Sequence, residues 1–328
     1  MDARDLKVFE AVARHGRMSQ AATELNTVQS NVTAQIRRLE EELGVALFER
    51  HARGVTLAPP GRRLLPYAKK LAAMVDEARR AALDDGTPRG SLVVGALETT
   101  TAMRLSPLLN RYVGAHPNVD LSLRTGTTCE LVDRVRAGEL EGAFVCGPIA
   151  SSELEVRHAF TEELVLLTGS RLQSLEDLER TTTELRIIVL RAGCSYRQRL
   201  EEILARRGIV PVRVLEFGSL EAILGCVAAG LGVTLLPGAL VDSVWRDGLR
   251  MHALPPRDAQ VETLFIHRRD GYCSSALRAF LDVVLTHGPT EARRANHHTE
   301  TTQRQSVPTL VPAERDVHPV ASGLIDAS

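Results

Sequence analysis

The chain has 328 residues, of which 44% are hydrophobic and 25% charged, and its formal net charge is -1. A single domain usually has about 100–200 residues, so this length favours two or three domains over one. No apolar run reaches the roughly 20 residues of a membrane-spanning helix, and the polar N-terminus does not resemble a signal peptide. We therefore expect a cytoplasmic protein with no membrane partner.

Local charge and cysteine spacing narrow the possible functions. The first 80 residues hold 14 basic and 10 acidic side chains and are net +4, whereas the remainder is net -5. This asymmetry favours an N-terminal region that faces phosphate groups. The five cysteines lie far apart and form no C-x-x-C pair, which argues against a structural zinc site or a disulfide framework.

Residues 1–60 are predicted to form a winged helix-turn-helix domain. An apolar stripe over residues 6–13 indicates a first helix that ends at His15-Gly16. Ser19 is expected to cap a second helix, which Asn26-Thr27 then breaks. A third helix follows, in which the apolar residues recur at three- and four-residue steps and are expected to be buried. These are Val28, Val32, Ile36, Leu39 and Leu43.

The opposite face of that third helix is polar and could enter the major groove of DNA. Amide, hydroxyl and guanidinium groups near a helix N-terminus can reach base edges and phosphates, and Gln29 is the best candidate for reading a base. The alternative is an ordinary solvated helix face. The DNA-binding candidates on this helix are Gln29, Ser30, Asn31, Thr33, Gln35 and Arg37.

A wing is predicted after Leu43-Gly44. Arg50 and Arg53 flank a turn that precedes a β-like segment at residues 55–57. Arginines at the tip of a wing can lie along or enter the minor groove, although two solvated loop arginines would give the same pattern.

These residues together resemble the N-terminal domain of LysR-type transcriptional regulators. The resemblance rests on Phe9, Ala21-Ala22, Leu25, Gln29, Ile36, Leu39-Glu40, Leu43-Gly44, Leu47-Phe48, Arg50, Leu57 and Gly61. This chain differs from the usual family pattern at two places. It has Ser30 where the family usually has proline, and Thr33-Ala34 where the family usually has serine followed by a basic residue. The resemblance implies a sequence-specific regulator whose partners are double-stranded operator DNA, a small-molecule effector and, in addition, RNA polymerase.

Residues 61–90 are predicted to be a linker helix followed by a hinge. The helix has a stripe close to a coiled-coil seam, Pro66 is expected to kink it, and residues 84–90 have a hinge composition. The stripe consists of Leu64, Tyr67, Leu71, Met74, Ala78 and Ala81. The resemblance implies that this helix pairs two subunits, giving a homodimer or a dimer of dimers. The alternative is a helix that packs on its own effector domain.

Residues 91–287 alternate apolar runs with helical stretches and are predicted to be an α/β effector domain. We expect two α/β subdomains, residues 91–161 with 268–287 and residues 162–267, in a layout like that of periplasmic binding proteins. The resemblance to the LysR family extends over this region. Residues 288–328 are poor in large apolar residues and are predicted to be a disordered tail.

An effector cleft is predicted where the strands of the two subdomains end. Ligands of parallel α/β units lie at the carboxyl ends of strands, next to helix N-termini, and several hydroxyl groups recur there. This favours a small polar, anionic metabolite, although each Ser or Thr alone could be a helix cap. The effector-binding candidates are Thr99, Thr100, Thr127, Cys146, Arg191, Ser195 and Gly218.

Two other classes of function remain as alternatives. Cys194 lies at a predicted helix N-terminus near Arg191 and Arg197, in a C-S-Y-R segment that resembles one LysR subgroup, and its thiol could act as a redox sensor. A solute-binding protein or enzyme on the same effector fold would need no helix-turn-helix. The sequence has no H-E-x-x-H, G-x-S-x-G or phosphate-binding loop, so no catalytic residue, metal ligand or cofactor is predicted.

Overall fold

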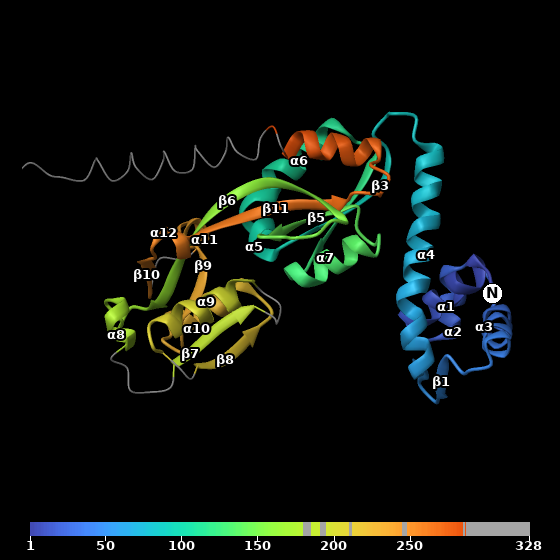
Figure 1. Ribbon diagram of the computed structural model, residues 1–328, viewed down its shortest axis with the longest axis horizontal. Coiled ribbons are helices and arrows are strands. Elements are labelled where there is room, and N and C mark those ends of the chain that lie inside the picture. The colour runs from blue at the N-terminus through green and yellow to red at the C-terminus, as the bar shows by residue number, and fades with distance from the viewer. Residues whose placement is uncertain (180–184, 191–194, 210–211, 245–247, 285, 287–328) are drawn as a thin grey trace, which may run out of the picture. The chain divides into compact units, whose positions relative to one another are not determined.

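The computed structural model describes residues 1–179, 185–190, 195–209, 212–244, 248–284 and 286 (Figure 1). The predicted tail, residues 288–328, therefore lies outside the described residues, and so do Arg191 and Cys194.

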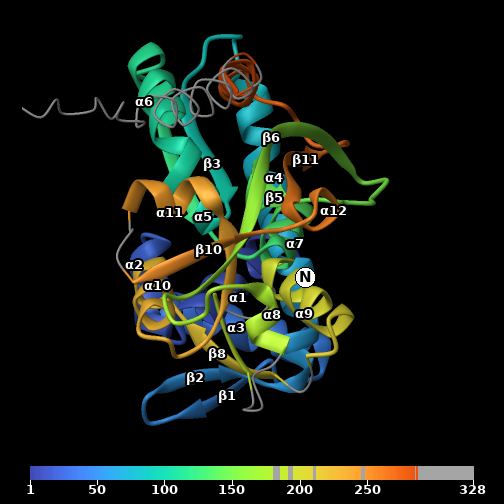
Figure 2. The ribbon, with the colours of Figure 1, turned by 90° about the vertical axis from the view of Figure 1, so that its left-hand side faces the viewer.

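The N-terminal domain is a three-helix unit with a β-hairpin, and Figure 2 shows the hairpin extending from the helices. Asn26 adopts a φ of 50°, which turns the chain between the second and third helices. The prediction that Ser19 caps the second helix is wrong, because the helix begins at Met18 and Ser19 lies inside it. The N-cap residue is Arg17, which makes no side-chain capping bond. The elements are α1 (Ala3–His15), α2 (Met18–Glu24), α3 (Gln29–Leu43), β1 (Phe48–His51) and β2 (Gly54–Leu57).

The core of this domain lies where α1, α2 and α3 meet. Phe9 is fully buried and its ring lies 5.3 Å from that of Phe48. Val32, Ile36 and Leu39 are buried, as their spacing predicted.

The ends of the predicted α3 stripe are not buried. Val28 is 63% exposed and Leu43 is 38% exposed, so the prediction that both lie in the core is wrong. Val28 has an extended backbone, with φ of -94° and ψ of 152°, and therefore does not follow the helical periodicity. Leu43 is the last residue before Gly44, whose left-handed backbone ends the helix.

The hairpin is tied to the end of α1 by a close backbone approach. Val55 N–H donates a hydrogen bond to Gly16 O over 2.9 Å. Gly54 has a φ of 142°, and a Cβ atom at this position would lie 2.3 Å from Gly16 O. Only glycine fits there, so this contact fixes the hairpin beside the helices.

A single long helix, α4 (Pro59–Leu83), follows the hairpin and continues through Pro66. Leu64 and Leu71, with Leu65 and Ala68, pack against the core of the N-terminal domain. Other apolar side chains of α4 face outward: Tyr67 is 70% exposed, Met74 58% and Val75 46%. The predicted stripe is thus divided between a face packed on its own domain and an exposed face.

The first core of the effector domain has a parallel sheet at its centre. β3 (Gly90–Ala96) lies between β4 (Val119–Thr125) and β5 (Gly142–Cys146), and β11 (Gln260–Arg268) pairs with β5 in the antiparallel sense. The largest buried side chains are aromatic, and the Tyr112 hydroxyl donates a hydrogen bond to Ala276 O over 2.8 Å. The elements are β3 (Gly90–Ala96), α5 (Glu98–Thr100), the π-helix η1 (Thr101–Leu105), α6 (Ser106–Ala115), β4 (Val119–Thr125), α7 (Thr128–Arg136), β5 (Gly142–Cys146) and a final helix at residues 275–284.

The second core contains two groups of strands with helices beside them. β7 pairs with β8 in parallel, and a bridge between Ile187 and Val233 connects β7 to the segment that leads into β9. β9 and β10 pair with the second half of β6. The elements are β6 (Leu154–Gly169), α8 (Leu175–Glu179), β7 (Leu185–Leu190), α9 (Ser195–Arg206), β8 (Val212–Phe217), α10 (Leu220–Ala228), β9 (Thr234–Pro237), α11 (Gly238–Val244), β10 (Leu249–Ala253), α12 (Pro256–Ala259) and β11 (Gln260–Arg268).

Two long strands belong to both cores. β6 and β11 pair with each other antiparallel over most of their length and connect the two parts of the effector domain (Figure 1). The boundary predicted at residue 162 falls between Phe160, in the first core, and Leu164, in the second. The boundary predicted at residue 268 lies too late, since Phe265 packs in the first core although the second subdomain was expected to run to residue 267. Among the described helices, none combines the length and apolarity needed to cross a membrane.

Candidate functional site

The polar face of α3 is exposed at its N-terminal end. Gln29, Ser30 and Asn31 are exposed, and Arg37 is exposed two turns further along the helix. The Thr33 hydroxyl donates to Gln29 O over 2.9 Å, and Asn31 Nδ2 donates to Thr27 Oγ1 over 3.1 Å. Thr33 and Asn31 thus use side-chain hydrogen bonds to stabilise the start of the helix.

An open groove lies between α3, the start of α2 and the β1–β2 hairpin. It brings together four predicted DNA-binding residues: Gln29, Thr33, Arg50 and Arg53. Arg17, which the sequence analysis did not select, is exposed and lies in the same groove. The signal that could have found Arg17 is its position as the basic residue immediately before the helix-turn-helix. Ser30, Asn31, Gln35 and Arg37 are not in the groove lining.

The base of the hairpin is fixed by Glu40. Its Oε1 accepts hydrogen bonds from the backbone N–H groups of Leu47 (2.8 Å) and Phe48 (3.1 Å). Its Oε2 lies 3.9 Å from the guanidinium of Arg50, whose side chain is 43% exposed. The contact leaves the Arg50 guanidinium accessible to an anion of the solvent or of a nucleic acid.

The effector cleft lies where α5, α7 and α9 begin. Four predicted residues, Thr99, Thr127, Cys146 and Ser195, line a cavity of about 50 Å³. Thr100 is buried but is not in the lining, and neither is Gly218. The remaining lining residues are Leu97, Glu98, Thr125, Gly126, Thr128, Glu130, Leu190 and Tyr196.

Hydrogen bonds across this cleft connect the two cores. Ser195 Oγ donates to Thr128 Oγ1 over 3.2 Å, and Thr128 Oγ1 also accepts from the backbone N–H of Cys146 over 3.2 Å. Thr127 caps α7 in a capping box with Glu130, whose Oε2 accepts from Thr127 N–H over 2.9 Å. The T-x-x-E spacing of this box is a sequence signal that could have identified Glu130.

The charge of the described cleft differs from the sequence-based expectation. Its charged lining residues are the carboxylates Glu98 and Glu130, and the other described lining residues are neutral. Arg191, the predicted charge partner of an anion, lies outside the described residues. The described groups therefore favour a hydrogen-bonding ligand rather than a bare anion.

Comparison with known proteins identifies the family. Residues 3–62 match the family model described as "Bacterial regulatory helix-turn-helix protein, lysR family", and residues 85–289 match "LysR substrate binding domain". The chain belongs to the LysR family. LysR-type proteins are DNA-binding transcriptional regulators with an effector-binding domain, so this chain is a regulator and not an enzyme.

Individual LysR relatives are similar over nearly their whole length. YusT of Bacillus subtilis (strain 168), described as an uncharacterized HTH-type transcriptional regulator, is 46% identical over 283 residues, which cover 86% of this chain and 95% of the relative. The HTH-type transcriptional regulator GltR of the same organism is 43% identical over 286 residues, with the same coverage of 86% and 95%. The structure of full-length CbnR complexed with its target DNA has 25% identity and a TM-score of 0.61, and the match covers 90% of this chain and 100% of that chain.

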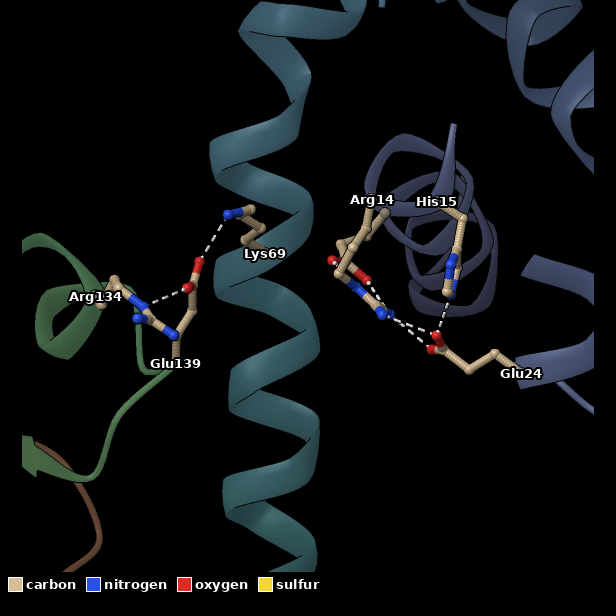
Figure 3. Close-up of polar contacts among 7 residues, drawn as sticks. Arg14, His15, Glu24, Lys69, Arg134 and Glu139 are labelled. Atoms are coloured by element: carbon tan, nitrogen blue, oxygen red, sulfur yellow. Dashed lines mark hydrogen bonds and ion pairs between the residues drawn. The ribbon is translucent and has the colours of Figure 1, made fainter. Parts of the chain in front are cut away.

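The linker helix of this LysR regulator contacts its own effector domain. Lys69 Nζ donates to Glu139 Oε1 over 2.8 Å, and Arg134 Nε lies 3.3 Å from Glu139 Oε2 (Figure 3). Further along α4, Glu77 Oε2 lies 3.2 Å from Arg268, and Glu77 Oε1 accepts from the Tyr272 N–H over 2.7 Å. One face of α4 therefore packs on its own effector domain, the alternative considered in the sequence analysis, while the face with Tyr67 and Met74 remains exposed.

The hinge is anchored to the first turn of the last helix. Asp84 Oδ2 accepts from Ser275 N–H over 2.7 Å and from the Tyr272 hydroxyl over 2.9 Å. Hydrogen bonds from the backbone of Ser275 and Gly86 hold the pKa of Asp84 well below its ordinary range. Since these donors stabilise the carboxylate, Asp84 is a charged cap that joins the end of α4 to residues 275–284.

An ion-pair cluster joins α1 to α2 in the DNA-binding domain (Figure 3). Both Glu24 oxygens accept from the Arg14 guanidinium, at 2.7 and 2.8 Å, and His15 Nε2 lies 2.6 Å from Glu24 Oε2. The hydrogen bonds from Arg14 and then His15 lower the pKa of Glu24 to about 2. This cluster stabilises the packing of the two helices that support α3.

Proposed function

We propose that residues 1–60 bind double-stranded operator DNA, with Gln29 reading a base edge in the major groove. The observation that supports this most directly is the groove in which the exposed Gln29 amide lies together with Arg17, Arg50 and Arg53. An amide can make paired hydrogen bonds to adenine, whereas guanidinium groups on a hairpin chiefly neutralise phosphates. Ser30, Asn31, Thr33, Gln35 and Arg37 complete the proposed contact surface.

The active form in this proposal is a homodimer, or a dimer of two dimers, in the cytoplasm. The exposed Tyr67 and Met74 of α4 support it, because they lie at helical spacing on one face and a second α4 would cover them. A two-fold dimer places two α3 helices on two half-sites of an operator. RNA polymerase would be a further partner at the promoter.

The regulatory signal in this proposal is a small polar metabolite bound in the effector cleft. The hydroxyl groups of Thr99, Thr127 and Ser195 support it, since they converge on one cavity from both cores. An anionic metabolite would need a positive charge from outside the described lining, and Arg191 remains the predicted source. A ligand acts at a distance only if its affinity differs between two arrangements of the protein.

A footprint on the DNA upstream of the gene tests this function. We expect the purified full-length protein to protect two half-sites related by two-fold symmetry and to change the protected pattern when the correct metabolite is added. Gln29→Ala should remove the sequence preference of the footprint. Protection of every sequence alike by the unaltered protein would contradict the proposal.

The same footprint separates ligand sensing from redox sensing through Cys194. If hydrogen peroxide changes the pattern, dithiothreitol reverses the change and Cys194→Ser abolishes it, then the signal is oxidation. If metabolites alone change the pattern in both the unaltered protein and Cys194→Ser, then the cleft is the sensor.

A further inference from the structure

An apolar side chain is exposed at the start of α3, where a polar residue would stabilise the helix. Val28 is the N-cap residue, is 63% exposed, and makes no side-chain capping bond. Ser, Thr, Asp and Asn are preferred at this position because they accept hydrogen bonds from free backbone N–H groups of the first turn. Val28 neither packs in the core nor caps the helix, so its side chain does not contribute to folding in either of these ways.

The backbone on both sides of Val28 is fixed. Thr27 N–H donates to Ala22 O over 2.9 Å, and the Thr27 hydroxyl accepts from Asn31 Nδ2 over 3.1 Å. Val28 O accepts from the Asn31 N–H over 3.1 Å. A β-branched side chain has a restricted χ1 angle, so few directions are open to the two methyl groups of Val28. They are pre-organised for contact with a partner.

The neighbouring residues indicate what that partner is. Val28 immediately precedes Gln29, which lies in the groove together with the basic residues Arg50 and Arg53. A single exposed valine on a protein surface is common and would mean little elsewhere. At the N-terminus of a helix that enters the major groove, however, the apolar group that a valine can meet is the C5-methyl of thymine.

We propose that Val28 packs on the C5-methyl group of a thymine in each operator half-site, next to the base that Gln29 reads. This inference rests on the proposed DNA-binding role of α3. It makes Val28 a specificity-determining residue, because cytosine presents no methyl group at the same position in the groove and the contact would be lost.

The test removes single methyl groups from the DNA. An operator is first selected from random double-stranded DNA with the full-length protein, and each thymine of its half-sites is then replaced in turn by deoxyuridine. We expect the unaltered protein to lose about fourfold in affinity per half-site at one thymine position, which corresponds to about 0.8 kcal/mol for one buried methyl group. Val28→Ala should bind the parent operator more weakly and should no longer respond to deoxyuridine at that position.

Val45→Ala is the matched control. Val45 is 43% exposed and follows α3 at its opposite end, so this variant should keep the methyl dependence of the unaltered protein. The inference is wrong if no thymine replacement weakens the unaltered protein, if the half-sites contain no thymine, or if Val28→Ala keeps the same methyl dependence. Selection of no preferred sequence would instead overturn the proposed DNA-reading function itself.

Discussion

Ser195 Oγ lies 3.2 Å from Thr128 Oγ1, and this hydrogen bond joins the first turn of α9 in one core to the first turn of α7 in the other. The cavity beside the two hydroxyls has a volume of about 50 Å³. In this arrangement the two hydroxyls are bonded to each other, so a ligand that hydrogen-bonds to both of them must compete with the contact between Ser195 and Thr128.

Ser195→Ala is therefore expected to loosen the cleft in the absence of ligand. The lost hydrogen bond stabilises the closed arrangement by about 0.5–1.5 kcal/mol, so amides of α7 and α9 should exchange with solvent roughly two- to tenfold faster. Hydrogen exchange of the full-length protein measures this change. The control is Ser152→Ala, at an exposed position outside the cleft. Equal exchange rates in the two variants would show that the hydrogen bond between Ser195 and Thr128 does not hold the cleft closed.

Arg50→Ala and Gln29→Ala are expected to weaken DNA binding in different ways. The loss of Arg50 should weaken binding to all sequences and reduce the slope of log affinity against log salt by about 0.9, because one phosphate contact is lost. The loss of Gln29 should leave the slope unchanged and reduce discrimination against the wrong base by about 1–3 kcal/mol. A salt titration on operator and scrambled DNA measures both quantities.

The control for this pair is Arg257→Ala, since Arg257 is exposed on the effector domain. Its slope should equal that of the unaltered protein. Identical slope changes in the Arg50 and Gln29 variants would contradict the assignment of separate roles.

Met74→Glu is expected to produce monomers with an intact fold. Met74 is 58% exposed, so a carboxylate there meets water in the monomer but would be buried without a partner charge in the proposed dimer. Leu71 is unsuitable for this test, because it packs against the core of its own DNA-binding domain and a charge there would destabilise that domain. Sedimentation measures the mass, and circular dichroism confirms the fold.

Asp76→Lys provides the matched control on α4, because Asp76 is exposed on the side of the helix opposite Met74. Sedimentation at the mass of the unaltered protein is expected for this variant. A Met74→Glu protein that keeps its dimer mass would place the interface elsewhere.

The contact between α1 and α2 is expected to weaken in acid. Because hydrogen bonds from Arg14 lower the pKa of Glu24 to about 2, the ionised carboxylate stabilises the folded state. That stabilisation is fully present above the ordinary pKa of 4.5 and is lost as the pH falls from 4.5 towards 2. Its size should stay below about 1 kcal/mol, because the Glu24 side chain is 38% exposed.

Hydrogen-exchange protection of α2 amides as a function of pH measures this effect. Glu24→Gln should be less protected than the unaltered protein at pH 6 and should show little further loss in acid. Glu49→Gln, which alters an exposed carboxylate on the hairpin, should follow the unaltered protein. A parallel pH dependence in Glu24→Gln would show that other groups cause the loss.

The sequence predicted the elements whose buried residues recur with one clear period. Val32, Ile36 and Leu39, at three- and four-residue steps, defined α3. The first half of β6 has no such period, because three consecutive residues that include Arg157 and His158 are exposed.

The candidate sites were only partly predictable for a different reason. The hydroxyl groups at strand ends identified Thr127 and Ser195. The hydrogen bond between Ser195 and Thr128 could not be predicted, because it depends on how the two cores pack together and not on a local sequence pattern. Similarly, Val28 fits the apolar period of α3, and only the extended backbone at the N-cap reveals that its side chain is exposed.

The pairing of β6 with β11 has a consequence for synthesis on the ribosome. Phe160 belongs to the first core together with Phe265 and Phe280, which are made more than 100 residues later. At a synthesis rate of about 5–20 residues per second, the last strand and helix of that core are made roughly 6–24 s after Phe160. Over this interval the first core lacks Phe265 and the last helix, so a nascent effector domain should be a strong client of ribosome-associated chaperones. The DNA-binding domain, in contrast, is complete by Leu71 and can fold at once.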